Sequence, residues 1–372
     1  MEIYKIPIEL AFMFFPLIAF ILTIPFLLYQ YRKYGAIPIL KSFIFYSLVL
    51  YLICAYFLIM LPLPSIEAVK KLSTPKVQLI PFNFIKDILA TTNLKITNIS
   101  QLIAIFKQPT IYTVLFNIVL TLPFGVYLRY FYNKKWYQTI MYTFLLSLFF
   151  ELTQLSGLYG VYPRPYRLFD VDDLLINTLG GFVGYLISPL FTIFLPTKEE
   201  LEEKSYKKGI RVSLLRRFIS FSIDFFFLGI VVICSKIATY GFGLSKYSNL
   251  IALVIYYLFI PLFFEGQTIG KKIIRIKLIG IEGNVTILNK LTRYILFAFL
   301  TIFPYLWINP LKDKMDIDII KRLWIIISIY EFINILYYII AFFKGVPLFL
   351  YEKVTNTKNV SAIQTSTKDK NN

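Results

Sequence analysis

The chain has 372 residues, of which 58% are hydrophobic and 16% charged, and its mean hydropathy of +0.68 indicates an integral membrane protein and excludes a soluble globular domain. Its net charge of +18 does not indicate nucleic-acid binding, because the Lys and Arg residues lie between apolar runs, where they set orientation and contact anionic lipid headgroups. The sequence contains no histidine, which excludes Ser-His-Asp and Cys-His catalysis and His-ligated metal sites.

Nine apolar segments approach the length of about 20 residues that a helix needs to cross a bilayer. The first is long and no small-residue cleavage site follows it, so we interpret it as a span and not as a signal peptide. We predict an all-α polytopic membrane protein with about nine transmembrane helices in two bundles, of five and four. The segments cover residues 8–29, 42–63, 111–131, 137–157, 173–195, 218–239, 248–264, 294–310 and 323–343.

A densely charged stretch, "PTKEELEEKSYKKGIRVSLLRR", separates the two groups of spans and has no apolar periodicity, which predicts a cytoplasmic linker. The predicted organisation is a membrane domain over 1–195, the linker over 196–217, a second membrane domain over 218–360 and a disordered tail over 361–372. The connection over 64–110 contains the short apolar runs "VQLIPFNFIKDIL" and "ISQLIAIF", which favour an interfacial or re-entrant arrangement.

The distribution of basic residues predicts the orientation in a bacterial cell membrane. Assigning all 39 Lys and Arg residues to alternate sides places 24 inside and 15 outside when the N-terminus is outside and the C-terminus cytoplasmic. Cys54 and Cys234 both lie inside apolar spans. We interpret them as buried small hydrophobic residues and not as a disulfide or metal pair.

The string "RLFDVDDLLINTLGG" brings an arginine and three aspartates to the outer end of the fifth span. Asp173, Asn177, Gly181 and Gly184 follow at helical spacing, so they share one face that is polar above and glycine below. Gly180 and Gly184 form a GxxxG pattern, which predicts close contact with a neighbouring helix.

Polar groups of two other spans occur at a similar depth. Asn117, Glu151 and Asn177 each lie roughly 6–9 Å below the outer boundary at 1.5 Å per residue, and Gln154 follows Glu151 by one turn. Such groups must pair with one another or line a wet cavity, and Arg167 is their nearest cation. The alternative is structural: Asp172 or Asp173 caps the fifth span, and the remaining polar groups bond to one another.

Four strings in order, "LIPFNFI", "NIVLTLPFG", "ELTQ" and "RLFDVDDLLINTLGGFVGY", resemble the VanZ-like family of bacterial membrane proteins. The resemblance covers the second to fifth spans. It implies an integral membrane protein linked to resistance to teicoplanin-type glycopeptides, without defining a biochemical activity. Carried over by position, the motif residues of the family are Pro81, Phe82, Asn117, Pro123, Gly125, Glu151, Gln154, Arg167, Asp170, Asp173, Asn177 and Gly180.

The second half of the chain has its own polar pattern. In "RRFISFSIDFFFLGI", Arg217 lies at the inner edge of the sixth span and Asp224 two turns further in, on the same face. The string "GQTIGKK" after the seventh span indicates a tight turn with a basic end, and it lacks the spacing of a phosphate-binding P-loop. Its candidate site residues are Gly266, Gln267, Thr268, Gly270 and Lys271.

This arrangement resembles the RDD family, which is named for an arginine and two aspartates. Arg217 and Asp224 match the first two, "GQTIGKK" matches the middle motif, and Glu352 stands where the family has its second aspartate. Some members have been proposed to exchange cations for protons, which by resemblance makes Asp224 a candidate carrier. Glu331, near mid-membrane with Asn334 one turn later, is the other candidate. The structural alternative pairs Arg217 with Asp224 and bonds Glu331 inside the bundle.

Three functions follow as hypotheses. The first is a non-enzymatic envelope protein without a cofactor or metal, which contacts membrane lipids and binds a cell-wall precursor or glycopeptide-related ligand at the outer polar cluster. The second is a cation/proton antiporter that uses Asp224 and either Glu331 or Glu352. The third is an enzyme acting on a lipid phosphate, with Asp170, Asp172 and Asp173 holding Mg²⁺.

Overall fold

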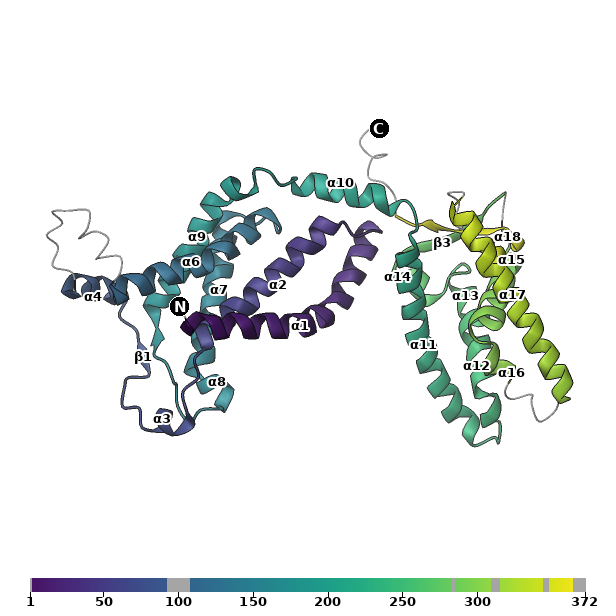
Figure 1. Cartoon of the computed structure of the whole chain (residues 1–372), viewed down its shortest axis with the longest axis horizontal. Coiled ribbons are helices and arrows are strands. Elements are labelled where there is room, and N and C mark those ends of the chain that lie inside the picture. The colour runs from purple at the N-terminus through teal and green to yellow at the C-terminus, as the bar shows by residue number, and fades with distance from the viewer. Residues whose placement is uncertain (1, 92–107, 283–284, 309–314, 344–347, 364–372) are drawn as a thin grey trace. The chain divides into compact units, whose positions relative to one another are not determined.

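The computed structural model describes residues 2–91, 108–282, 285–308, 315–343 and 348–363 (Figure 1). The chain forms two compact units. The first comprises Met1–Thr23 and Pro38–Leu201, and the second comprises Ile24–Ile37 and Glu202–Asn372. Helices α1 (Glu2–Tyr34) and α10 (Lys198–Gly209) contribute residues to both units.

The first unit is built around three helices of similar length that lie side by side, α6, α7 and α9 (Figure 1). Its only described strands form a two-residue parallel pair, in which Val77 lies opposite Phe169 and Gln78 opposite Asp170. Besides the helices shared with the second unit, its elements are α2 (Ile39–Met60), α3 (Ile66–Lys70), β1 (Val77–Gln78), α4 (Asn83–Thr91), α6 (Pro109–Tyr130), α7 (Trp136–Leu155), α8 (Gly157–Gly160), β2 (Phe169–Asp170) and α9 (Val171–Thr192).

Glycine lets α9 lie directly against the backbone of α6. A Cβ atom added to Gly184 would clash with the carbonyl oxygen of Leu122, and one added to Gly125 would clash with the carbonyl oxygen of Gly181. A Cβ on Gly181 would also meet the side chain of Thr143 on α7. The close helix contact predicted from the GxxxG pattern is therefore confirmed, and it brings the polar ends of three helices together.

The second unit packs α11, α12 and α15 around buried aromatic side chains, among them Tyr256, Tyr257, Tyr294 and Phe303. Strands β3 and β4 pair antiparallel, from Ile276 opposite Ser361 to Gly280 opposite Thr357. The elements are α11 (Leu214–Tyr240), η1 (Ser245–Tyr247), α12 (Ser248–Val254), η2 (Ile255–Phe259), α13 (Ile260–Phe263), α14 (Ile269–Ile273), β3 (Ile276–Gly280), α15 (Ile287–Tyr294), η3 (Ile295–Ile302), α16 (Pro304–Ile308), α17 (Ile317–Phe343), α18 (Leu350–Val354) and β4 (Thr357–Ser361).

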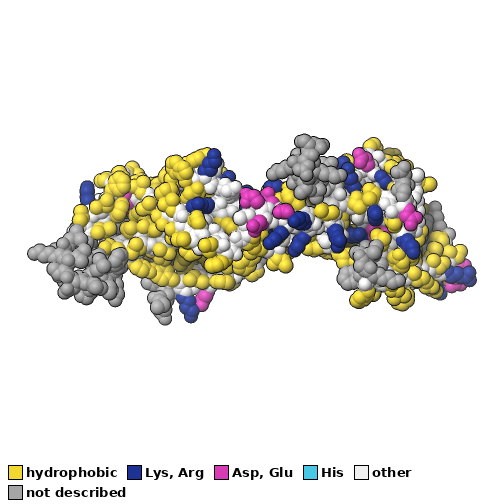
Figure 2. Space-filling view, turned by 90° about the horizontal axis from the view of Figure 1, so that it is seen from above, with side chains coloured by type: hydrophobic (Ala, Val, Ile, Leu, Met, Phe, Trp, Pro, Cys, Tyr) yellow, Lys and Arg dark blue, Asp and Glu magenta, His cyan; other side chains and the backbone are white. Residues whose placement is uncertain are grey.

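Seven helices of the described residues are long and apolar enough to cross a membrane, and each matches a predicted span. Hydrophobic side chains cover much of the first unit on the face that Figure 2 presents, as expected for a protein surrounded by lipid. Of the other two predicted spans, 137–157 forms helix α7 but is not among the seven. The span over 294–310 is broken, because the π-helix η3 ends at Ile302 and Phe303 separates it from the short α16.

Three local predictions need correction. Residues 196–217 contain helix α10 and the start of α11. Helix α10 forms because acidic residues in its first turn and basic residues in its last turn complement the helix dipole, and because Glu203 pairs with Lys207. Residues 361–363 are ordered and not part of a disordered tail, since Ser361 belongs to β4 and the Ala362 N–H donates to the carbonyl oxygen of Arg275, while 364–372 lie outside the described residues. Cys234 is exposed, because its position on α11 faces away from the core.

The connection over 64–110 contains α3, β1 and the nine-residue helix α4. Helix α4 covers the end of the first apolar run, "VQLIPFNFIKDIL". The second run, "ISQLIAIF", lies outside the described residues.

The glycine contact predicts the effect of adding a single methyl group. Gly184→Ala should destabilise the protein by about 1–3 kcal/mol, because the new Cβ has no space against α6. Gly229→Ala on α11 is the matched control, since no atom lies within 4 Å of its added Cβ. The thermal unfolding temperature in detergent should fall for the first variant alone, and equal temperatures for both would contradict the close packing.

Candidate functional site

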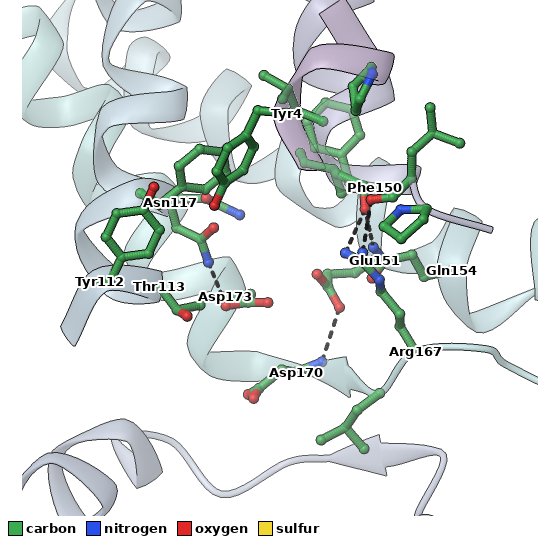
Figure 3. Close-up of a pocket in the computed structure, with 18 residues that line it drawn as sticks. Tyr4, Tyr112, Thr113, Asn117, Phe150, Glu151, Gln154, Arg167, Asp170 and Asp173 are labelled. Carbon is green, nitrogen blue, oxygen red and sulfur yellow. Dashed lines mark hydrogen bonds between the residues drawn. The ribbon is translucent and has the colours of Figure 1, made fainter. Parts of the chain in front are cut away.

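A pocket of about 490 Å³ lies in the first unit at the start of α9 (Figure 3). Aromatic side chains form part of its wall, and three carboxylates and one guanidinium face it. We call it the acidic pocket. All seven residues predicted for the outer cluster line it: Asn117, Glu151, Gln154, Arg167, Asp170, Asp173 and Asn177.

The α9 wall of the acidic pocket is fixed by bonds to α6 and α7. Asn117 Nδ2 donates to Asp173 Oδ1 at 2.7 Å, and Asn177 Nδ2 donates to Ser147 Oγ at 2.9 Å. The Thr121 hydroxyl donates to the carbonyl oxygen of Asn177 at 2.8 Å. The side-chain oxygen of Asn177 is buried and has no partner among the described residues. A ligand or water is therefore needed to satisfy this acceptor.

The opposite wall comes from α7 and the segment before α9. The backbone N–H of Asp170 donates to Glu151 Oε2 at 3.0 Å. Arg167 donates to the carbonyl oxygens of Ile59 and Leu61 at 2.7 and 3.0 Å, and Gln154 also donates to Ile59. Figure 3 shows Glu151 and Asp173 extending into the space between Asn117 and Arg167.

The guanidinium is thus held by the end of α2. No ion pair among the described residues joins Arg167 to a carboxylate. The expected pairing of this arginine with Glu151 or the aspartates is not seen, because backbone carbonyls take both of its terminal nitrogens.

The three aspartates before and within α9 have different tasks. Asp170 is the N-cap and accepts from the Asp172 N–H at 2.8 Å, so the predicted cap at Asp172 or Asp173 is wrong. Burial raises the pKa of the Asp170 carboxyl, although the hydrogen bond from the Asp172 N–H opposes the rise. Asp172 turns the other way and accepts the backbone N–H groups of Phe82 and Phe84, at 2.6 and 2.8 Å.

Residues 45–192 match the family model described as VanZ/LLP1. The matched segment lies within the first unit, which therefore contains a region similar to the VanZ/LLP1 family. No curated protein and no solved structure matches the chain.

The motif residues of the VanZ-like domain fall into two groups in the structure. The seven polar ones line the acidic pocket. The others shape the backbone around it: Phe82 has a positive φ of 64° and donates its N–H to Asp172, and Pro123 lies inside α6. Gly125 and Gly180 lie where α6 and α9 touch.

Four of the residues predicted in the second half line a cavity of about 370 Å³ in the second unit, which we call the Lys271 cavity: Arg217, Asp224, Thr268 and Lys271. Asp224 is 4% exposed, and its Oδ1 accepts from the Tyr256 hydroxyl and the Gly270 N–H, both at 2.7 Å. Its Oδ2 accepts from the Thr268 hydroxyl at 2.8 Å. Any side chain at Gly270 would clash with Asp224, which explains a glycine there.

Arg217 does not pair with Asp224. Its NH1 lies 3.1 Å from Glu352 Oε2, and Arg293 NH2 lies 2.6 Å from Glu352 Oε1. Glu352 is fully buried. Burial opposes its ionisation, but the charges of Arg293 and Arg217 prevail and lower its pKa.

The remaining predicted residues have supporting positions. Thr268 caps α14, Gln267 is buried, and the Gly266 carbonyl accepts from the Tyr294 hydroxyl at 2.9 Å. Glu331 is half-buried on α17 and does not line the Lys271 cavity. Its neighbour Asn334 accepts from the Leu350 N–H.

Sequence reasoning missed several residues. Ser147 lies one turn before Glu151, and Arg216 lies one turn before Ser220 on the buried face of α11, so helical spacing contained both signals. Arg216 is fully buried and donates to backbone carbonyls that include Ile274 and Arg275. Arg293 is distant in sequence from Glu352, and no local pattern indicates their pairing.

The bonds of Asp172 predict that it holds the segment before α4. Asp172→Ala should increase hydrogen exchange of the Phe82 and Phe84 amides, because both lose their acceptor. Asp173→Asn is the control, since it leaves these two amides bonded. Hydrogen exchange with mass spectrometry of the peptide over 79–88 measures the effect, and unchanged exchange in Asp172→Ala would refute this anchoring.

The lowered pKa of Glu352 predicts acid sensitivity. Since the folded state holds this carboxylate ionised, it binds fewer protons than the unfolded chain near the ordinary pKa of 4.5. The stabilisation is present above pH 4.5 and is lost as the pH falls through the lower folded-state pKa. Unfolding temperatures between pH 7 and pH 3.5 should show this loss in the parent and in the exposed-site control Glu282→Gln, whereas Glu352→Gln should show less.

Proposed function

We propose that this is an integral membrane protein of the bacterial envelope whose VanZ-like domain binds a cell-wall or lipid-linked ligand in the acidic pocket. Binding changes the response of the cell to teicoplanin-type glycopeptides, and no reaction is catalysed. The observation that carries the proposal is the convergence of all seven predicted polar residues on one pocket of about 490 Å³. If these polar groups served only to hold the helices together, they would bond to one another in a closed bundle and leave no such space.

The bonding pattern supports a ligand with several hydrogen-bond donors. Hydrogen bonds within the protein engage Oε2 of Glu151 and Oδ1 of Asp173, which leaves the second oxygen of each carboxylate to face the pocket. The unpartnered oxygen of Asn177 adds a third acceptor. Hydroxyl and ammonium groups, which are abundant in cell-wall sugars and stem peptides, match such acceptors.

Two alternatives have less support from the contacts. For a lipid-phosphate enzyme with Mg²⁺, the three aspartates would have to converge, yet Asp170 caps α9 and Asp172 bonds to backbone amides on its other side. Among the described residues, no group of three Asp, Glu, Cys or His is placed to hold a metal ion. For cation/proton exchange, Asp224 would have to give up three hydrogen bonds when it releases its ligand.

A drug-tolerance assay tests the proposal. Glu151→Gln and Asp173→Asn should each abolish teicoplanin tolerance conferred by the protein, because losing a charge-assisted hydrogen bond weakens ligand binding by about 1.5–3 kcal/mol. Glu67→Gln is the control, since this carboxylate is exposed outside the pocket. The minimum inhibitory concentration is measured in cells with equal amounts of each variant in the membrane. Teicoplanin tolerance equal to that of the parent in both pocket variants would contradict the proposal.

A further inference from the structure

The Lys271 cavity contains buried polar atoms whose bonding is incomplete. Arg217 Nε, Ser220 Oγ, Tyr257 OH and Asn359 Oδ1 are buried without a hydrogen-bond partner among the described residues, and all four residues line this cavity. Ser220 is 2% exposed and Tyr257 is 1% exposed. Buried polar groups are rarely left unpaired, so four around one cavity indicate a missing occupant with polar atoms.

Most of these unpaired atoms are able to donate a hydrogen bond. The Arg217 Nε–H can only donate, and the hydroxyls of Ser220 and Tyr257 are able to donate. Lys271 adds its ammonium, which contacts the Tyr294 hydroxyl at 3.2 Å and has two further N–H groups. An occupant that accepts several hydrogen bonds, such as an oxyanion, fits this set.

The charges around the cavity also favour an anion. Arg217, Lys271 and Arg293 line it, and Asp224 is the only carboxylate among its lining residues. The adjoining Glu352 is held by both arginines. With Lys271 protonated, these five groups carry a net charge of +1, which one singly charged anion neutralises. A cation would add to the excess.

The apolar walls of the Lys271 cavity indicate that the anion is the headgroup of an amphiphilic molecule. Much of the lining is apolar or aromatic, including Phe221, Phe297 and Phe349. Leu214 and Phe218, which also line the cavity, are 45% and 64% exposed, so the apolar lining continues onto the outer surface of α11. Helix α11 is one of the helices able to cross a membrane, and lipid therefore surrounds this surface.

We propose that the Lys271 cavity binds the phosphodiester headgroup of an anionic phospholipid. Lys271, the Arg217 Nε–H and the hydroxyls of Ser220 and Tyr257 bind the phosphate oxygens. The acyl chains leave past Leu214 and Phe218 along α11. This site lies in the second unit and does not depend on the acidic pocket.

The test measures binding of phosphatidylglycerol to the full-length protein in detergent by native mass spectrometry. Phosphatidylglycerol should bind more tightly than phosphatidylcholine, whose headgroup has no net charge. Free glycerol phosphate should not compete, because it lacks the chains that contact the apolar walls. Equal binding of the two lipids would overturn the proposal, and competition by free glycerol phosphate would overturn the assignment to a lipid.

Tyr257→Phe is the sharpest variant. Its hydroxyl has no hydrogen-bond partner in the described part of the chain, so the substitution should leave the unfolding temperature unchanged or higher, yet weaken phosphatidylglycerol binding by about three- to tenfold. Lys271→Gln should weaken it tenfold or more, and the exposed neighbour Lys272→Gln is the matched control. If Tyr257→Phe binds the lipid as the parent does, the cavity is not its site.

Binding should also depend on pH through Lys271. Burial and the nearby Arg293 lower the pKa of this lysine to about 7, so its ammonium is present at pH 6 and mostly absent at pH 8.5. The other groups that face it are Arg217 and Asp224 from α11, Tyr294 from α15 and Glu352 from α18. Phosphatidylglycerol affinity should fall as the pH rises through 7, and this fall should disappear in Lys271→Gln. A parent affinity that does not change over this range would contradict the role of the lysine.

Discussion

At Gly180, Gly181 and Gly184, helix α9 has no room for side chains against α6 and α7. This backbone contact sets the distance between the helices and therefore the bonds above it. Asp173 reaches Asn117 on α6, and the α9 backbone accepts from Thr121, only because the helix axes are close. In the hydrocarbon of a membrane, the burial of apolar side chains contributes little to helix association. Close packing at small residues and hydrogen bonds between helices therefore provide most of the stability of a helix contact. The glycines thus position the acidic pocket without touching any ligand.

The polar groups above the glycines divide into two kinds. Asp172 and Arg167 bond to backbone amides and carbonyls of segments outside the helix bundle, so they fix the pocket's rim. Glu151 and Asp173 each use one oxygen for the protein, and Asn177 keeps an unpaired oxygen. A purely structural network would satisfy all of these acceptors, because an unpaired buried polar group costs free energy. The incomplete bonding therefore favours the proposed binding site over a purely structural helix contact.

Helical periodicity was enough to predict the side-by-side placement of Asn117, Glu151 and Asn177, because residues on long apolar helices keep fixed depths and faces. It was not enough to predict the N-cap. Pairing of β1 with β2 holds Asp170 in extended conformation, so α9 begins at Val171, before the predicted caps Asp172 and Asp173. This long-range pairing has no local signal. Helix α10 was missed for a different reason: it is charged on all sides, and its ends are stabilised by charges and not by an apolar face.

The second unit holds its two buried carboxylates, Glu352 and Asp224, in different ways. In the second unit, Glu352 is buried between two arginines and further bonded by the Phe349 N–H and the Asn359 amide. Removing a buried charge's partners is costly, so this cluster is fixed. Asp224 is held by neutral donors, which leaves the charge of Lys271 without an ion-pair partner among the described residues. Its ammonium lines the cavity and donates to the Tyr294 hydroxyl, and it is the group whose charge the proposed anion neutralises.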